Sequence, residues 1–217
     1  MATAGPATGP TIAIVSQKGG SGKTTLALHL ATCAAYDGKR GCVIDLDPQA
    51  TAAAWGDWRG SFLPEVVTCP PVRLATTILK AQRGGAGMVV IDTPPQSDMA
   101  AREAVRAADL VLIPTRPRAF DLHALQATAD LVGLTRKPAF VVLNSVPSRA
   151  TRMVADATAR IGELGLEVCP VHLGERAAFH RASATGEVAS EAEPEGKAAA
   201  EIDALWDWMM QQLDGVT

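Results

Sequence analysis

The sequence predicts an α/β fold, in which helices cover both faces of a doubly wound, mostly parallel sheet. Short β-branched runs alternate with helix-length segments, which is typical of parallel strands joined by crossover helices. Several of these runs, such as residues 12–15 and 88–91, are continuously apolar, as are strands buried on both faces. No repeat, linker or long low-complexity tract interrupts the 217 residues, so we expect one domain.

The expected strands follow the apolar runs in order. They span residues 11–16, 41–45, 66–69, 88–92, 110–114, 139–144 and 167–171. The expected helices lie between and after the strands, at residues 23–37, 50–60, 75–83, 99–108, 122–135, 151–164, 175–184 and 195–213.

The last expected helix carries one apolar stripe at helical spacing. Its members are Ile202, Leu205, Trp206, Met209 and Leu213. A stripe of this kind favours a terminal helix packed on the core. Membrane-surface helices carry Lys and Arg on their polar face, whereas this segment is acidic. We therefore expect no membrane binding.

The N-terminal residues and the cysteines indicate the cellular location of the protein. The first ten residues lack the basic and apolar regions of a signal peptide, so we expect a flexible tail at 1–10 and the domain at 11–217. The cysteines are scattered, without the spacing of a disulfide framework or a zinc site. They are Cys33, Cys42, Cys69 and Cys169. This usage favours a reducing, cytoplasmic location.

The stretch QKGGSGKTT at residues 17–25 predicts a phosphate-binding loop. It follows a strand and opens a helix, which is the context that such a loop requires. Glycines let successive N–H groups point at phosphate oxygens, and the helix N-terminus adds partial positive charge. We expect Lys23 to reach the β- and γ-phosphates and the Thr24 hydroxyl to bind Mg²⁺. The nucleotide-binding set is Gly19, Gly20, Ser21, Gly22, Lys23, Thr24 and Thr25.

Acidic residues end two of the apolar strands. Asp45 and Asp47 follow the second strand, and Asp92 ends the strand at 88–92. The carboxyl ends of parallel strands are where ligands bind in open α/β sheets. Asp92 is therefore expected to hold Mg²⁺, directly or through water. For Asp45 or Asp47 alone, an acid that caps a turn before Pro48 remains an alternative.

These motifs resemble those of the ParA/MinD family of ATPases over nearly the whole chain. The loop departs from the strict P-loop pattern at Gln17, where Gly is expected, and carries a second lysine, Lys18. The run K-G-G-x-G-K-T-T is similar to the family's deviant Walker A loop. Residues 45–49 match its D-x-D-P-Q segment, residues 92–95 its D-T-P-P segment, and residues 114–121 its P-x-x-P-x-x-x-D stretch.

The resemblance implies roles for further residues. Lys18 would cross to the nucleotide of a partner subunit, Asp47 would orient the attacking water, and Asp45 would sit near the metal. Asn144 would read adenine, with Pro170 and Val171 as a second wall of the base site. A solvated loop lysine is the alternative for Lys18, and a turn-forming Asn is the alternative for Asn144.

The resemblance also implies a positioning cycle. ATP and Mg²⁺ would clamp two copies into a sandwich dimer, which binds DNA without sequence preference. A ParB-like or cargo-adaptor protein would stimulate hydrolysis and release the dimer, segregating a plasmid or chromosome or positioning a protein cargo on the nucleoid. No N-terminal helix-turn-helix module is expected, because only about ten residues precede the first strand.

The charge distribution bears on the DNA expectation. Residues 136–181 hold seven Lys or Arg against four acids, whereas residues 182–217 hold one Lys against eight acids. Phosphate contacts give salt-sensitive affinity without sequence preference. The candidate DNA contacts are Arg149, Arg152, Arg176 and Arg181. Ordinary surface pairs with Glu163, Glu167 and Glu175 are the alternative for these arginines.

Other proteins with this loop remain alternatives. A small ATP-dependent metabolic ligase, similar to dethiobiotin synthetase, shares the expected fold, although Lys18 and the D-x-D-P-Q run argue against it. A relative of the nitrogenase iron protein would need paired cysteines at its dimer axis, and no suitable pair is present.

Overall fold

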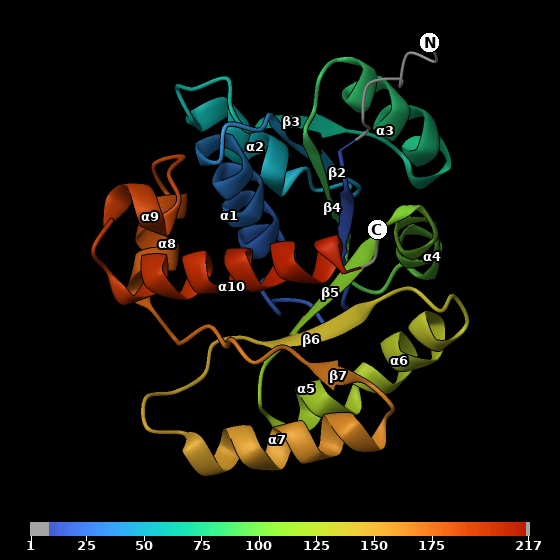
Figure 1. Cartoon of the computed structure of the whole chain (residues 1–217), viewed down its shortest axis with the longest axis vertical. Helices are drawn as coiled ribbons and strands as arrows, with labels where there is room; N and C mark the ends of the chain where they lie inside the picture. Colours follow the sequence, from blue (N-terminus) through green and yellow to red (C-terminus); the bar gives the residue numbers. More distant parts are fainter. Residues whose placement is uncertain (1–8, 216–217) are drawn as a thin grey trace.

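The computed structural model describes residues 9–215, so most of the expected tail at 1–10 lies outside the described residues. Its centre is a seven-stranded parallel sheet with the order β3-β2-β4-β1-β5-β6-β7 (Figure 1). The strands are β1 (Thr11–Ile14), β2 (Gly41–Asp45), β3 (Glu65–Thr68), β4 (Met88–Asp92), β5 (Leu110–Thr115), β6 (Ala139–Leu143) and β7 (Glu167–Val168). The predicted fold class is therefore confirmed.

The register of the central strands brings the acidic strand ends together. Ile14 at the end of β1 pairs with Asp92 of β4, and Asp45 of β2 pairs with the same Asp92. On the other side of β1, Ile14 pairs with Leu112 of β5. The loop after β1 therefore starts between the carboxyl ends of β4 and β5, where ligands bind in open parallel sheets.

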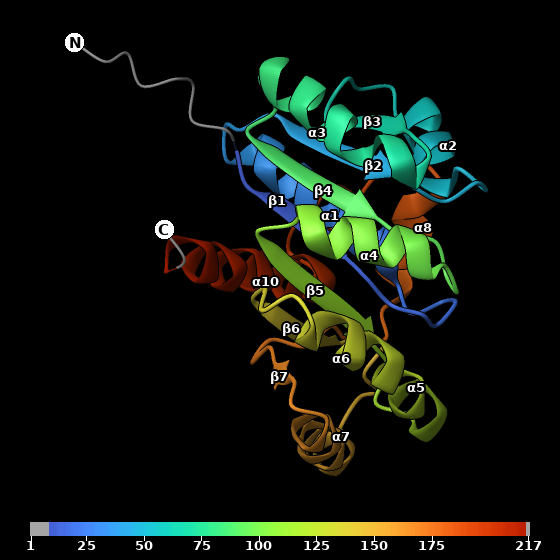
Figure 2. The same ribbon diagram turned by 90° about the vertical axis from the view of Figure 1, so that its right-hand side faces the viewer.

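Helices cover both faces of the sheet (Figure 2). Their bounds are α1 (Lys23–Tyr36), α2 (Thr51–Trp58), η1 (Pro71–Arg73), α3 (Leu74–Arg83), α4 (Asp98–Ala107), α5 (Ala119–His123), α6 (Leu125–Gly133), α7 (Thr151–Glu163), α8 (Ala177–Ser183), α9 (Ala189–Ala192) and α10 (Lys197–Asp214). Buried residues of α1, α2, α8, α9 and α10 form one core, and those of α3 to α7 form the other.

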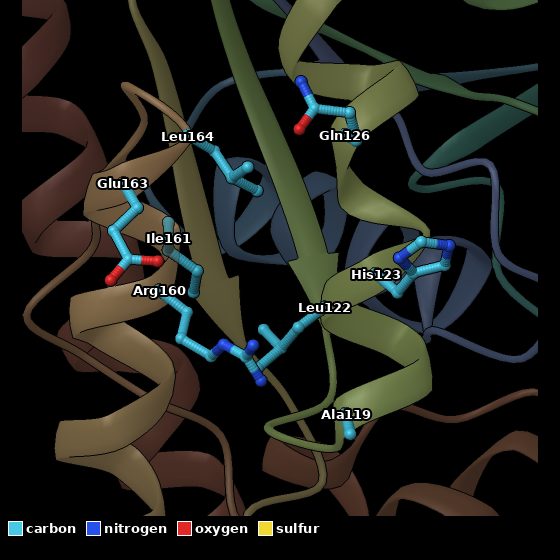
Figure 3. A pocket seen from close by; sticks show the side chains of 8 residues that line it. All are labelled: Ala119, Leu122, His123, Gln126, Arg160, Ile161, Glu163 and Leu164. Atoms are coloured by element: carbon cyan, nitrogen blue, oxygen red, sulfur yellow. The ribbon is translucent and has the colours of Figure 1, made fainter.

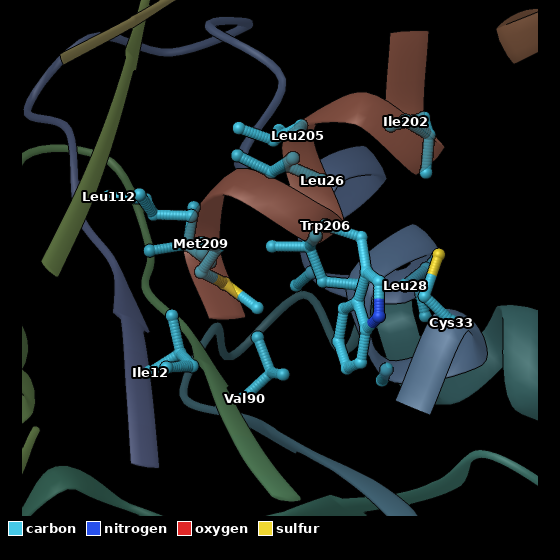
Figure 4. Close-up of a cluster of buried hydrophobic side chains, with 14 of the residues drawn as sticks. Ile12, Leu26, Leu28, Cys33, Val90, Leu112, Ile202, Leu205, Trp206 and Met209 are labelled. Carbon is cyan, nitrogen blue, oxygen red and sulfur yellow. The ribbon is translucent and has the colours of Figure 1, made fainter. Parts of the chain in front are cut away.

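The strand side chains alternate between the two cores, as the pleat of a strand requires. Ile12 and Ile14 face the core of α1, whereas Ala13 and Val15 face the other. The expected apolar stripe of α10 is buried in the first core: Ile202, Leu205, Trp206, Met209 and Leu213 are at most 8% exposed. Figure 4 shows Leu205, Trp206 and Met209 lying among side chains of α1 and the sheet. The terminal helix therefore packs on the core.

Four local features differ from the sequence expectations. The helix expected at 122–135 is two helices, α5 and α6, because the chain bends at Ala124 (φ −70°, ψ −12°) without a proline or glycine to announce it. The strand expected at 167–171 ends at Val168, ahead of Pro170, which has no N–H to donate. The 3₁₀ turn η1 and the four-residue helix α9 were not expected, and both are too short to show a periodic pattern.

Among residues 9–215, no helix combines the length and the apolar character needed to cross a membrane. The four cysteines are free thiols, as expected. Burial raises the pKa of Cys33, Cys42 and Cys169 to about 12. These three thiols are therefore protonated at neutral pH.

Candidate functional site

The phosphate loop lies where the sequence predicts it, between β1 and α1. Gly20 and Gly22 have φ of +69° and +97°, a region that favours glycine. A Cβ at Gly22 would lie 2.1 Å from the Asn144 Nδ2 atom, so a larger residue would collide there. The loop can therefore wrap tightly around a ligand only with glycine at these positions.

Lys23 is the buried cation of the loop, with 7% of its surface exposed. Its Nζ donates to the Lys18 carbonyl at 3.2 Å. Burial lowers the pKa of Lys23, and the negative charges of Asp92 and Asp47 oppose that shift. A cation held in this way is suited to an anionic ligand. Lys18 itself is exposed, at the rim of the loop.

Asp92 lies buried at the end of β4, and its Oδ1 atom has no hydrogen-bond partner among the described residues. Burial raises the pKa of Asp92 to about 7, and Asp45 and Asp47 add to the rise, whereas the Thr24 hydroxyl and Lys23 oppose it. A buried carboxylate oxygen without a partner is a ready acceptor for a cation. Asp92 and Thr24 therefore fit the expectation of a Mg²⁺ site.

Protein side chains alone do not form a metal cage here. Within residues 9–215, no group of three or more His, Cys, Asp or Glu is arranged to hold a metal ion. Mg²⁺ characteristically keeps several waters and binds through one or two protein oxygens together with substrate phosphates. The pair formed by Asp92 and Thr24 matches that mode of binding.

Asp45 and Asp47 belong to one hydrogen-bonded turn. The Asp45 carboxylate accepts from the backbone N–H of Asp47 at 2.8 Å and of Ala52 at 3.0 Å, so it caps the first turn of α2. Asp47 is half-buried, and one of its oxygens accepts from the Gln49 N–H at 2.9 Å. Asp45 thus fixes the loop that carries Asp47. The metal role of Asp45 and the water-positioning role of Asp47 stay predictions.

A cavity of about 380 Å³ opens beside the phosphate loop. Its lining residues are Gly20, Gly22, Thr25, Arg116, Arg118, Asn144, Ser145, Gly174, Glu175, Arg176, Phe179 and His180. Asn144 donates from Nδ2 to the Ser21 carbonyl at 2.7 Å, and its Oδ1 accepts from the Ser145 N–H. Asn144 thus reaches the loop, as expected of a base-site residue, and its adenine contact stays a prediction.

The expected second wall of the base site stays a prediction. Pro170 and Val171 are absent from the lining of this cavity, whose far side is formed by residues 174–176 and by Phe179 and His180 of α8. β7 ends early, at Val168, and the chain then continues to Gly174, which forms an isolated parallel bridge with Val146. A base in this cavity would therefore meet residues 174–180.

The four candidate DNA arginines lie beside two different helices. Arg149 and Arg152 lie before and on α7, whereas Arg176 and Arg181 lie before and on α8, and the two helices pack on opposite faces of the sheet. Arg176 pairs with Glu201 at 2.6 Å, and Arg181 pairs with Glu193. The acids differ from Glu163, Glu167 and Glu175, the pairs that the sequence offers as an alternative. The DNA role of these arginines stays a prediction.

A second cavity, of about 240 Å³, lies between α5, α6 and α7. Figure 3 shows Arg160 of α7 reaching toward Leu122 of α5 across its mouth. Its lining includes Ile161 on α7, Leu164 just after α7 and His123 on α5, but no residue of the phosphate loop. This cavity is therefore separate from the candidate nucleotide site.

Two residues near the loop were not identified from the sequence. Arg116 follows β5 and donates through Nη2 to the Gly20 carbonyl. His29 lies on α1, where Nδ1 meets the Thr25 carbonyl at 2.7 Å and Nε2 accepts from the Ala189 N–H at 2.9 Å. Arg116 occupies an unspecified position of the P-x-x-P-x-x-x-D stretch, and His29 lies outside the motifs, so the contacts of both residues depend on which distant segment packs beside them.

Comparison with known proteins places these features in a family. A family model described as the CobQ/CobB/MinD/ParA nucleotide binding domain matches residues 12–189. The chain is 33% identical over 209 residues to "Maintenance of carboxysome distribution protein A" from Gloeobacter kilaueensis, covering 94% of this chain and 93% of the relative. It is 29% identical over 180 residues to "Protein ParA" from Rhizobium radiobacter, covering 78% and 80%.

The fold is also found among solved structures. The septum site-determining protein MinD from Pyrococcus horikoshii, complexed with Mg-ADP, matches with a TM-score of 0.73 and 17% identity. The match covers 96% of this chain and 98% of that one. At this identity the likeness concerns the fold, and it agrees with the parallel sheet and the loop described above.

Proposed function

This chain belongs to the CobQ/CobB/MinD/ParA family of nucleotide-binding proteins, which includes partition and positioning ATPases, and we propose that it hydrolyses ATP to drive such positioning. In the proposed cycle, ATP joins two copies into a sandwich dimer that binds DNA without sequence preference. A ParB-like or cargo-adaptor protein stimulates hydrolysis and releases the dimer. The cargo is plasmid or chromosome DNA, or a protein assembly carried on the nucleoid.

The phosphate loop supplies the binding step. The N–H groups at the start of α1 and the buried Lys23 take the phosphates, replacing the Lys18 carbonyl as the partner of Lys23 Nζ. Asp92 and Thr24 hold Mg²⁺, which neutralises negative charge on the phosphates when it is bound. Asp47, whose turn is fixed by Asp45, orients the attacking water with its carboxylate.

One observation carries the proposal of an ATP-driven dimer. Lys18 is exposed at the rim of the loop whose other lysine, Lys23, is buried beside Asp92 and Asp47. The inner lysine is committed to the nucleotide of its own subunit. The outer lysine remains free to neutralise phosphates across an interface, where a charge-assisted contact is strongest once water is excluded.

The experiment that tests the function is a gel-shift titration on two unrelated DNA duplexes. It is run with ATP, with ADP and without nucleotide, each in the presence of Mg²⁺ and at two salt concentrations. We expect binding with ATP alone, equal on both duplexes and weakened by salt, because phosphate contacts release counterions. Absence of binding in every state would contradict the DNA-based cycle and favour the metabolic-ligase alternative.

A further inference from the structure

We propose that Arg116, at the end of β5, is a phosphate-binding residue of the nucleotide site. The inference rests on the nucleotide binding proposed above and adds a cation that lies outside the phosphate loop. Four observations carry it: the position of Arg116, its contact with the loop, its lack of an acidic partner and the cavity that it lines.

The sheet places Arg116 beside the loop. β5 lies next to β1, with Leu112 paired to Ile14, so the ends of both strands emerge together. Arg116 directly follows β5, between Thr115 and the buried Pro117. The Thr115 carbonyl accepts from the Asn144 N–H at 2.8 Å, which ties this end of β5 to β6. The backbone that carries Arg116 is therefore held in place before any ligand arrives.

The side chain of Arg116 contacts the loop directly. Its Nη2 atom donates to the carbonyl of Gly20. A Cβ at Gly20 would lie 3.4 Å from this Nη2 atom, and Gly20 has a φ of +69° that side chains rarely adopt. Glycine at this position thus lets the guanidinium lie against the loop backbone.

The charge of Arg116 lacks a counterion. Its Nε atom is buried and has no hydrogen-bond partner, and no ion pair of Arg116 is present within residues 9–215. A guanidinium stays charged at any physiological pH, and a buried N–H without an acceptor is unfavourable. Arg176, which lines the same cavity, is instead paired with Glu201 at 2.6 Å. Arg116 is therefore a cation in this wall that, in the described part of the chain, has neither a counterion nor an acceptor for its buried N–H.

The same cavity is lined by Gly20, Gly22 and Thr25 of the phosphate loop, so the phosphates of a nucleotide would enter beside Arg116. The donors of a guanidinium form a planar fork. Arg116 can thus keep one N–H on the Gly20 carbonyl and present its Nη1 donors, for which the described residues offer no acceptor, to a phosphate oxygen. Charge-assisted hydrogen bonds of this kind are about twice as strong as neutral ones.

Substitution by Gln separates this role from a purely structural one. Arg116→Gln keeps an N–H donor for the Gly20 carbonyl but removes the charge, whereas Arg116→Lys keeps the charge and loses the fork. Arg106→Gln is the control, because Arg106 lies on α4, its side chain is 69% exposed and it does not line this cavity. The measurement is the Kd for N-methylanthraniloyl ADP and ATP at several salt concentrations, together with the melting temperature of the nucleotide-free protein.

For Arg116→Gln we expect a Kd raised about 10-fold for both nucleotides, a weaker salt dependence and an unchanged melting temperature. Arg116→Lys should give an intermediate Kd, and Arg106→Gln should bind like the parent. A Gln variant with the parent's Kd, or with a raised Kd and the parent's salt dependence, would overturn the inference while leaving the ATPase proposal standing. A parent that binds neither nucleotide would overturn both.

Discussion

At the scale of single residues, His29 links the phosphate loop to the C-terminal part of the chain. It is 3% exposed, and the Ala189 N–H requires Nε2 as an acceptor, so Nδ1 carries the proton that goes to the Thr25 carbonyl. Burial lowers the pKa of His29 to about 4, against 6.5 for the free side chain. A histidine that must stay neutral makes the fold sensitive to acid.

The sign of this effect follows from proton linkage. Between pH 6.5 and 4 the unfolded chain binds a proton at His29 more readily than the folded chain, so this residue makes stability fall as pH falls. Asp92 acts in the opposite direction. Its pKa is raised to about 7, so its contribution to the unfolding free energy is present at low pH and is lost as pH rises through that value. The two effects partly cancel in the parent protein.

We therefore compare the pH dependence of the unfolding free energy of the parent with that of His29→Gln, whose amide is neutral at every pH. Between pH 7 and pH 5 the parent should lose about 2 kcal/mol of unfolding free energy relative to the variant. Urea unfolding at the two pH values, without nucleotide or Mg²⁺, measures this quantity. Parallel changes in the two proteins would show that His29 does not titrate in this range.

Asp47 gives the second prediction at this scale. Asp47→Ala should bind ATP within about 3-fold of the parent, because Lys23 and the loop remain, but hydrolysis should fall about 100-fold as the water loses its orienting carboxylate. Equilibrium binding and single-turnover hydrolysis measure the two quantities. Asp57→Ala, an exposed acid on α2, is the control and should behave like the parent. Normal hydrolysis by Asp47→Ala would move the water-positioning role to another residue.

At the scale of secondary-structure elements, a charged junction joins the end of α2 to α9. Arg59 follows α2 and pairs with Glu191 of α9 at 2.5 Å, and the two side chains are 9% and 19% exposed. Arg59 also donates to the carbonyls of Gly186 and Leu63, and Glu191 accepts from Tyr36 of α1. Contacts of α1, the end of α2 and α9 therefore meet at one largely buried ion pair.

Removing only one charge of this ion pair should lower the unfolding free energy substantially. Glu191→Gln leaves the Arg59 charge buried without a counterion, and we predict a loss of about 3 kcal/mol in unfolding free energy. Glu193→Gln, which removes a more exposed pair with Arg181, should cost less than about 1 kcal/mol. Urea unfolding measures both, and equal losses would contradict the distinction. The double variant with Met at positions 59 and 191 should recover part of the stability, since no charge remains buried.

The elements that the sequence predicts well are those with long periodic or continuously apolar patterns. The central strands and α1 were expected at nearly their observed bounds, because burial on both faces leaves an unambiguous apolar run. The bend at Ala124, the short α9 and the early end of β7 were missed. The first two depend on tertiary packing, and the third depends on where Pro170 ends the ladder.

At the scale of the whole molecule, the phosphate loop could be predicted from a local sequence pattern, whereas the residues that surround it depend on tertiary packing. Residues 17–25, Asp92 and Asp47 are local motifs, so they could be predicted from the sequence. Arg116 and the wall at residues 174–180 come to the loop through the order of strands in the sheet. No short motif encodes that neighbourhood, and the base-site roles of Pro170 and Val171 stay predictions.

The proposed dimer gives a prediction at this scale. Lys18→Ala should bind ATP nearly as well as the parent, because Lys23 supplies the cation of its own subunit, but should remain monomeric with ATP and Mg²⁺. Sedimentation velocity in the presence of a slowly hydrolysed ATP analogue measures the assembly. Lys80→Ala, an exposed lysine on α3, serves as the control. A Lys18→Ala protein that dimerises like the parent would refute the cross-subunit role.

DNA binding gives the last prediction, and the structure changes which arginines should test it. Reversing Arg176 would break its pair with Glu201 and disturb the contact with α10, so a loss of binding there would be ambiguous. Arg149 is exposed, and the Arg152 side chain is 96% exposed with only a long 3.9 Å approach to Asp156. A pair this exposed contributes little to stability, so both arginines are available to phosphates.

We predict that Arg149→Gln and Arg152→Gln together lower DNA affinity equally on unrelated duplexes. Each lost phosphate contact should reduce the slope of log K against log salt by about 1. The ATP-dependent dimer should persist, since neither residue lies in the phosphate loop. Arg106→Gln on α4, whose side chain is 69% exposed, controls for the loss of one surface charge. An unchanged slope in the double variant would place the DNA contacts elsewhere, and Arg181 on the opposite face of the sheet would be the next arginine to replace.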